Sequence, residues 1–407
     1  MSTPGEAETT YGRWPDDDRL KGRRRRDVQA ALHSVVGGLR QGRDQMAGLS
    51  ERAGFGTSDR GGGRGKGDGE RKMVPEAAFT SYYGRPVVKP SPWKADIPAY
   101  FFLGGVAAGS SLLGAGADLT GRPALRRAAR LGALAGISLS MGALVHDLGR
   151  PSRFLNMQRV VKPTSPMSVG TWVLSLYGPL AGLAAMAEVA ELSGALPHVL
   201  RGPARLLASS ARPAGIGAAL VAPAVASYTA VLLSDTATPT WHDAHRHLPF
   251  LFVGSAAAAS GGLAMITAPV GQTSPARRMA VGGALMEFAV NQPMEVAMGL
   301  SAETLHQGKA GTYLQIAKVL NTIGVVGTVL LGRRSRTVSV LSGAALLAGS
   351  AYTRFGIFEA GQQSARDPKY TVVPQRERLD RRAAASTAGP SRQPPAPPSA
   401  VHETTRP

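Results

Sequence analysis

The chain has 407 residues and no cysteine, and its 46 Lys and Arg against 27 Asp and Glu give a formal net charge of +19. The absence of cysteine excludes disulfides, thiolate-bound iron–sulfur clusters and cysteine-ligated zinc within this chain. The mean hydropathy of −0.04, taken with the charge, is typical of a basic soluble protein that binds nucleic acid.

The mean hydropathy of the whole chain is an average over two different kinds of sequence. Residues 1–92 are rich in Gly, Arg, Asp and Pro, and residues 361–407 are charged and then rich in Pro, Ser and Ala. Neither tail has enough apolar surface to offset the entropy of ordering a chain, so we predict that both are disordered. Residues 93–360 contain long Ala, Gly, Leu and Val stretches with few charges. The sequence therefore predicts a transmembrane domain that contacts lipid and no nucleic acid.

Eight segments of this domain are long and apolar enough for membrane helices, since about 20 mainly apolar residues cross the hydrocarbon core. In chain order, the predicted helices cover residues 97–119, 128–148, 167–192, 213–234, 248–268, 279–300, 313–332 and 338–359. Turn or charge signals separate neighbouring helices. No secretory signal peptide is visible before them, and we expect the first helix to act as its own insertion signal. The predicted fold class is an all-α membrane protein with disordered tails.

Glycines recur inside the predicted helices at small-xxx-small spacing. Gly105 and Gly109 form one such pair, and Gly132 and Gly136 form another. Small residues allow membrane helices to approach closely. This spacing favours packing within the chain over a dimer interface.

The densest polar cluster, HDLGRPSR, covers residues 146–153 at the end of the second predicted helix. His146 titrates near neutrality, and Asp147 can orient its ring, so the pair can exchange protons with a redox ligand. A helix end held by a salt bridge from Asp147 to Arg150 or Arg153 explains the same residues equally well. Both interpretations remain open from the sequence.

The sixth predicted helix carries a second polar group. Glu287, Asn291 and Glu295 follow at four-residue spacing and share one helix face, and Pro293 should kink the helix. Carboxylates at membrane depth are costly, so this pattern favours a proton path or ion site. Neutralisation of each carboxylate by a neighbouring helix is the alternative.

Other polar residues give weaker signals. Arg354 and Glu359 on the last helix are expected to pair near the membrane interface. His242, His245 and His247 lie close together, but their spacing matches no metal-site template. No histidine lies in the middle of a predicted helix, where a bis-histidine haem would need it. We therefore predict no metal and no haem.

Five segments carry a family resemblance. They are IPAYFFLGGVAAGS at residues 97–110, HDLGRPSRFLNM at 146–157, SPMSVGTWVLSLYG at 165–178, SYTAVLLS at 227–234 and LPFLFVGSAAAASG at 248–261. In order, spacing and placement on helices they resemble the NrfD/PsrC-like family, the membrane subunit of polysulfide-reductase-type and related molybdopterin oxidoreductases. The resemblance covers residues 93–360, and the pairing of DLGRP with SPMS is its specific part.

This resemblance implies two four-helix bundles in a multi-pass protein of the prokaryotic cell (inner) membrane. It implies a bound quinone, menaquinone or ubiquinone, as substrate, and no haem or iron–sulfur cluster in this chain. Electrons would pass between the quinone pool and a ferredoxin-like iron–sulfur subunit, which connects to a molybdopterin catalytic subunit. The chain would then be a subunit of an oxidoreductase complex that is not catalytic alone.

The same resemblance implies which residues form the quinone site. Asp147, from the DLGRP motif, would exchange protons, and Tyr228, from SYTAVLLS, would donate a hydrogen bond to a quinone carbonyl. The remaining residues expected at this site are His146, Arg150, Asp96 and Tyr100. Tyr228 lies about 9 Å of helix rise before Ser234, so it would reach the site from deeper in the membrane.

Two other functions fit parts of the sequence. A proton-coupled secondary transporter would use Glu287 and Glu295 as coupling carboxylates, but transporters usually contain inverted repeats, and none is evident here. A structural anchor for a soluble enzyme would need no polar cluster at residues 146–153. The quinone-binding subunit accounts for more of these features.

Overall fold

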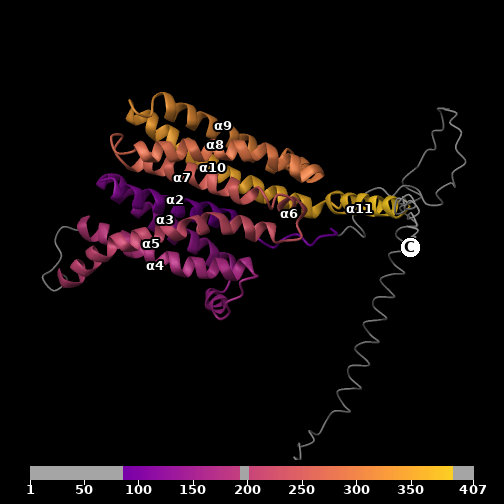
Figure 1. Cartoon of the computed structure of the whole chain (residues 1–407), viewed down its shortest axis with the longest axis horizontal. Helices are drawn as coiled ribbons and strands as arrows, with labels where there is room; N and C mark the ends of the chain where they lie inside the picture. The colour runs from indigo at the N-terminus through magenta and orange to yellow at the C-terminus, as the bar shows by residue number, and fades with distance from the viewer. Residues whose placement is uncertain (1–85, 193–200, 388–407) are drawn as a thin grey trace, which may run out of the picture. The chain divides into compact units, whose positions relative to one another are not determined.

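The computed structural model describes residues 86–192 and 201–387, and this part of the chain is helical (Figure 1). Its eight long helices are α2 (Asp96–Leu119), α3 (Pro123–Asp147), α4 (Pro166–Leu192), α5 (Arg201–Ser234), α7 (Leu248–Thr267), α8 (Ser274–Met298), α9 (Gly308–Leu330) and α10 (Arg336–Arg366). The shorter elements are η2 (Pro151–Gln158), α6 (Pro239–Asp243), η4 (Gly299–Leu305) and α11 (Lys369–Thr387). The all-α fold class is confirmed. Most of both predicted tails, at residues 1–85 and 388–407, lies outside the described residues.

Six described helices, α2, α3, α4, α5, α7 and α9, are long and apolar enough to cross a membrane. This confirms a multi-pass membrane protein. Polar and charged residues such as Glu287 on α8 and Arg354 on α10 lower the mean hydropathy of the other two long helices. These helices still expose large apolar side chains, among them Leu285 and Val296 on α8 and Leu341 on α10. Their crossing of the membrane, and hence the count of eight, stays a prediction.

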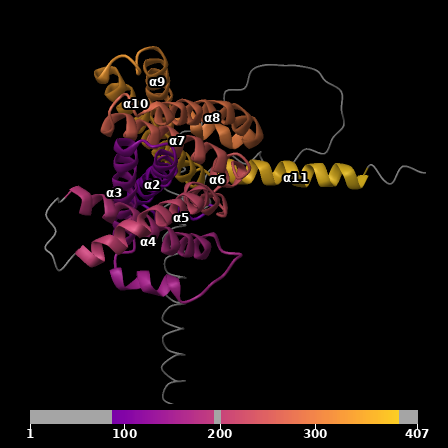
Figure 2. The ribbon, with the colours of Figure 1, turned by 60° about the vertical axis from the view of Figure 1, so that its left-hand side comes forward.

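The long helices pack in two groups of four. Helices α2 to α5 form the first bundle and α7 to α10 the second, and α2 and α7 lie side by side between them (Figures 1 and 2). Within each bundle, consecutive helices pack against each other, and α2 also packs against α5 as α7 does against α10. Because short loops join most neighbours, these helices run antiparallel.

Glycine permits the closest helix approaches. A methyl group built at Gly105 of α2 would lie 3.1 Å from Ala256 Cβ of α7, and one at Gly136 of α3 would lie 3.1 Å from Ala107 Cβ of α2. One at Gly283 of α8 would lie only 2.5 Å from the backbone oxygen of Gly254 on α7. The glycines with small-xxx-small spacing therefore face other helices of the same chain.

The structure corrects the predicted start of the C-terminal tail. Helix α10 continues to Arg366, and α11 follows from Lys369, so residues 361–366 and 369–387 are helical where the sequence predicts disorder. Tertiary contacts hold this segment: Gln362 Nε2 donates to the backbone oxygen of Ser91 at 3.1 Å, and Lys369 Nζ donates to Glu303 Oε2 at 2.6 Å. That hydrogen bond raises the pKa of Lys369. The composition of this segment predicts disorder, because it does not reveal that the partners of its polar residues lie far away in the sequence.

Candidate functional site

The end of α3 has a backbone geometry that its sequence explains. Gly149 has φ of +67°, in the left-handed region that glycine adopts without steric cost. The backbone N–H of Gly149 donates to the carbonyl of His146 at 3.1 Å, which closes the helix. Pro151 then begins η2. The DLGRP motif is therefore a helix end that leaves His146 and Asp147 at the last turn.

This last turn contacts the start of α2. His146 Nδ1 lies 3.1 Å from Asp96 Oδ2, and the backbone N–H of Lys94 donates a hydrogen bond to the Asp147 carboxylate. The His146 side chain is 79% exposed and that of Asp96 30%, so the histidine connects a half-buried carboxylate to the surface. Arg150 is exposed, and in the described part of the chain it forms no ion pair with Asp147. The structure therefore brings three of the expected residues together and leaves Arg150 outside the cluster.

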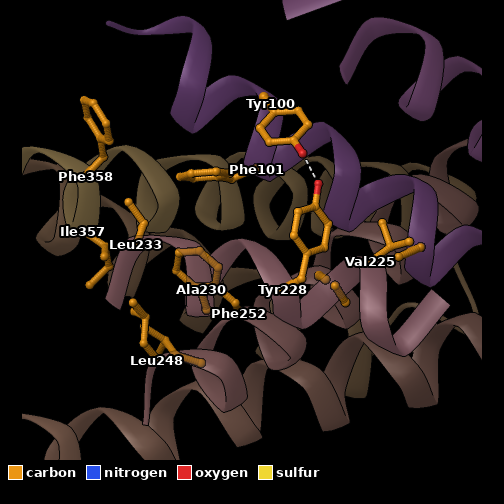
Figure 3. Packing of buried hydrophobic residues seen from close by; sticks show 14 of the residues in the cluster. Tyr100, Phe101, Val225, Tyr228, Ala230, Leu233, Leu248, Phe252, Ile357 and Phe358 are labelled. Carbon is orange, nitrogen blue, oxygen red and sulfur yellow. Dashed lines mark hydrogen bonds between the residues drawn. The ribbon is translucent and has the colours of Figure 1, made fainter. Parts of the chain in front are cut away.

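Tyr100 and Tyr228 meet one turn further into the first bundle. Their hydroxyl groups point toward one another and form a hydrogen bond between α2 and α5 (Figure 3). Both side chains are buried in a cluster with Phe101, Val225 and Phe252. Tyr228 therefore contacts another residue expected at the quinone site, and its role toward a quinone stays a prediction.

A partly open cavity of about 410 Å³ lies beside these residues, between α3, η2 and α4. Most of its lining is apolar, and Thr171, Ser175 and Gln158 supply polar groups. Gln158 Nε2 donates to Ser175 Oγ at 3.0 Å. The ring of Tyr228 packs directly on Gly170, the neighbour of Thr171. The cavity and the tyrosine pair thus lie on adjacent parts of α4.

The residues that line this cavity are not among those that the sequence predicts for the quinone site. Phe154 lies within the HDLGRPSRFLNM segment, and Thr171 and Ser175 lie within SPMSVGTWVLSLYG. Both segments belong to the family resemblance, which is the sequence feature that could have pointed to these residues. The fold of η2 against α4 was needed to show which of their side chains share one cavity.

The second bundle contains the other predicted group. Glu287 Oε1 accepts hydrogen bonds from Asn321 Nδ2 at 3.2 Å and from Thr353 Oγ1 at 2.6 Å. Glu295 accepts a hydrogen bond from Asn291 Nδ2 at 2.9 Å. All five residues line or border a cavity of about 560 Å³. Glu287, Asn291 and Glu295, which share one face of α8, therefore all line the same cavity.

The expected pairing of Arg354 with Glu359 near the interface is wrong. Arg354 is 1% exposed, and its Nη2 donates to the backbone oxygen of Phe252 at 2.5 Å. Its guanidinium carbon lies 3.7 Å from the centre of the Phe252 ring, a cation–π contact. The sequence could not reveal this contact because it joins α10 to α7.

The three neighbouring histidines make local contacts. His242 Nδ1 lies 3.2 Å from the backbone oxygen of Ser234, and the rings of His242 and His245 stack 5.7 Å apart. Among residues 86–192 and 201–387, no group of three or more His, Cys, Asp or Glu has the geometry of a metal site.

Comparison with protein families identifies the group to which this arrangement belongs. The family model described as "Polysulphide reductase, NrfD" matches residues 87–365, well over half of the chain. The chain belongs to the NrfD family. The matched region begins before α2 and ends at the last turn of α10, so it contains both bundles and both cavities. No curated protein matches the chain significantly.

NrfD membership sets the broad role of the chain. It is a multi-pass membrane subunit of a quinone-interacting oxidoreductase complex, and it works with partner subunits.

Proposed function

We propose that this NrfD-family chain binds quinone or quinol in the α3–η2–α4 cavity and exchanges protons with it through the end of α3. The observation that carries the proposal is an apolar cavity of about 410 Å³ whose wall includes Leu144, three residues before Asp147 at the end of α3. Small-molecule sites typically have about 300–1,000 Å³, mostly apolar walls and a few polar groups that fix orientation.

The walls of the cavity suit a quinone ring. Ile137, Met141 and Leu174 supply apolar contacts, while Thr171 and Ser175 offer hydroxyl groups to a carbonyl oxygen. The outer surface of the same helices is apolar, with large exposed side chains that include Leu139, Trp172 and Leu176. A lipid-soluble ligand could therefore enter from the hydrocarbon region without crossing a polar surface.

Quinone chemistry needs protons as well as electrons. Reduction of a quinone to quinol consumes two electrons and two protons, and oxidation releases them. His146, Asp96 and Asp147 form a chain of titratable groups from the surface to the end of α3. The ring of Tyr228, whose hydroxyl is hydrogen-bonded to that of Tyr100, packs on Gly170, the neighbour of Thr171 in the α4 wall. These residues would supply or accept the protons, and a partner subunit would supply or accept the electrons.

The partners follow from the same proposal. A ferredoxin-like iron–sulfur subunit would dock at the membrane face where α2 starts and α3 ends, and a molybdopterin subunit would carry out the catalytic reaction. The quinone would be menaquinone or ubiquinone of a prokaryotic inner membrane. This chain has no cysteine to ligate a cluster, so the cluster would belong to the partner.

Two glycines of α4 provide a matched test of the cavity. Methyl groups built at Gly178 and Gly182 meet no atom within 4 Å, but only Gly178 lines the cavity. Gly178→Leu should occupy the cavity, whereas Gly182→Leu, one turn away on the same helix, should leave it open. We expect Gly178→Leu to weaken quinone binding at least about tenfold, or about 1.4 kcal/mol, and Gly182→Leu to leave binding unchanged.

Binding would be measured on the purified chain in nanodiscs by titration with short-chain ubiquinone and menaquinone analogues. Quenching of tryptophan fluorescence is a suitable signal because Trp172 follows Thr171 on α4. Equal affinity in both glycine variants would contradict the assignment of the cavity.

A second pair of variants tests proton exchange. Asp147→Asn should lower quinol-linked turnover of the native complex while leaving quinone binding largely intact. Asp235→Asn is the control, because Asp235 is an exposed carboxylate at the end of α5 on the same membrane face. Unchanged turnover in Asp147→Asn would refute the role of that carboxylate.

A further inference from the structure

Glu287 lies at the middle of its helix and is nearly inaccessible. It comes thirteen residues after Ser274 and eleven before Met298, about 16 Å of helix rise from the nearer end of α8. The residue is 7% exposed. A carboxylate at such depth carries a large desolvation cost unless its charge is compensated or removed by a proton.

The two well-defined hydrogen bonds to Glu287 both reach the same oxygen. Asn321 Nδ2 and Thr353 Oγ1 both donate to Oε1. The other oxygen, Oε2, is buried and meets no donor at close hydrogen-bond geometry among the described residues. The Ser255 hydroxyl, which is bonded to Ser350 Oγ at 2.8 Å, also interacts with this carboxyl group. Two donors on one oxygen and none on the other suit a carboxylic acid, whose proton would be on Oε2.

The nearest cation does not neutralise Glu287 by direct contact. Arg354 is buried on α10, but within the described helices it forms no ion pair with Glu287, and its Nη2 donates instead to the Phe252 carbonyl. Lys318, on α9, lines the 560 Å³ cavity, whereas Arg354 does not. The charge-bearing residues of α2, Asp96 and Asp118, lie at its two ends. Arg354 therefore interacts with Glu287 electrostatically, but the two side chains form no direct ion pair.

A polar route leads from Glu287 to one end of the bundle. Asn291 and Glu295 follow one and two turns later on the same face and are hydrogen-bonded to each other at 2.9 Å. Glu295 Oε2 lies 3.1 Å from His306 Nε2, and the His306 side chain is 62% exposed. The four residues all line the 560 Å³ cavity. This cavity therefore extends from the surface to the middle of α8.

The mouth of this cavity lies at the same end of the molecule as the α3 cluster. Thr304 of η4, next to His306, contacts Thr240 of α6 at 2.8 Å. Trp241 of α6 in turn stacks on Trp93, just before α2, with ring centres 6.0 Å apart. Asp96 lies three residues after Trp93. Both polar clusters therefore open toward one membrane face.

We propose that Glu287 is a proton-binding site inside the second bundle, which is loaded through the α8–α9–α10 cavity by way of His306, Glu295 and Asn291. The proton adds to Oε2 of the carboxylate, and no electron moves in this step. The proposal goes beyond quinone binding, because none of these residues belongs to the first bundle. It assigns a second proton-handling site to the chain.

A carbodiimide that partitions into lipid tests this proposal on the full-length chain in native membranes. The O–H of a protonated carboxyl group adds across one C=N bond to give an O-acylisourea, which rearranges to a stable N-acylurea without losing any atom. Peptide mapping by mass spectrometry would locate the adduct. We expect Glu287 to be the main labelled residue, with labelling that falls as the pH rises.

Glu188 is a matched internal control. It is as deeply buried as Glu287, at 0% exposure, but it accepts hydrogen bonds from Arg126 at 2.6 Å and Arg130 at 2.9 Å. Because both of its oxygens accept hydrogen bonds from arginines, we expect a labelling yield at least tenfold below that of Glu287. Absence of label on Glu287, or equal label on Glu188, would overturn the proposal.

Infrared spectroscopy gives a second readout that needs no reagent. Protonated Glu287 should contribute a carboxyl C=O band that shifts in D2O, and the band should vanish in Glu287→Gln. Wild-type spectra remain decisive if that variant does not fold. Exposed carboxyl groups are ionised at neutral pH, so a neutral-pH spectrum without a carboxyl C=O band that shifts in D2O would reject the proposal. Neither measurement involves quinone, so either proposal can fail alone.

Discussion

Gly283→Ala provides the sharpest test of how α7 and α8 pack. A methyl group at Gly283 would lie 2.5 Å from the Gly254 backbone oxygen, 2.6 Å from the Ala258 nitrogen and 2.7 Å from Ala257 Cβ. The first two of these atoms belong to the backbone, which no side-chain rotation can move. The two helices would have to separate by up to about 1 Å to restore ordinary van der Waals contact.

The neighbouring residue isolates the magnitude of this effect. A methyl group at Gly282 meets no atom within 4 Å. Both substitutions change helix propensity equally, by at most about 1 kcal/mol in favour of alanine. The difference between the variants therefore measures overpacking alone, which typically costs about 1–3 kcal/mol. We expect Gly283→Ala to be less stable than Gly282→Ala by that amount.

The assay is thermal denaturation of the detergent-purified chain, followed by the loss of the monodisperse peak in size-exclusion chromatography. Gly282→Ala should denature at or above the wild-type temperature, and Gly283→Ala several degrees below it. Indistinguishable denaturation temperatures for the two variants would refute the close contact between α7 and α8.

Three further substitutions test contacts elsewhere. Glu188→Gln should destabilise the first bundle by about 3 kcal/mol, because it leaves the buried Arg130 with Asp118, at 3.4 Å, as its remaining ion-pair partner among the described residues. Glu191→Gln, at a 52% exposed side chain, should cost less than about 1 kcal/mol. Equal losses in thermal denaturation would count against this difference. Trp241→Phe removes the indole hydrogen bond to the Ile357 carbonyl, which measures 2.9 Å, and should cost about 1–3 kcal/mol in the same assay. Arg336→Met should loosen the end of α7, where Arg336 donates to three backbone carbonyls, and faster amide hydrogen exchange there would be the expected sign.

The predicted helix ranges show what a local pattern can reveal about this protein. Each long helix overlaps one apolar segment, because the requirement for about 20 apolar residues acts within a single stretch of chain. Helix ends were less accurate: α5 begins at Arg201, well before the predicted residue 213, because polar residues can continue a helix beyond the apolar region. The C-terminal boundary failed for a related reason, since α11 depends on Glu303 of η4.

For the candidate sites too, the sequence indicates single residues but not the contacts between them. The family motif selected Asp147 and Tyr228 as single residues, and four-residue spacing placed Glu287, Asn291 and Glu295 on one face. The motif could not show that Arg150 stays apart from the α3 cluster.

By itself, the sequence determined that this is an all-helical membrane protein with polar groups at two places in its apolar domain. Its resemblance to the NrfD family also came from motifs readable along the chain. Only the tertiary structure decided which polar groups meet: His146 with Asp96, Tyr100 with Tyr228, and Glu287 with Asn321 and Thr353. The physical reason is that these contacts join helices far apart in the sequence, and close packing of the bundles sets their distances.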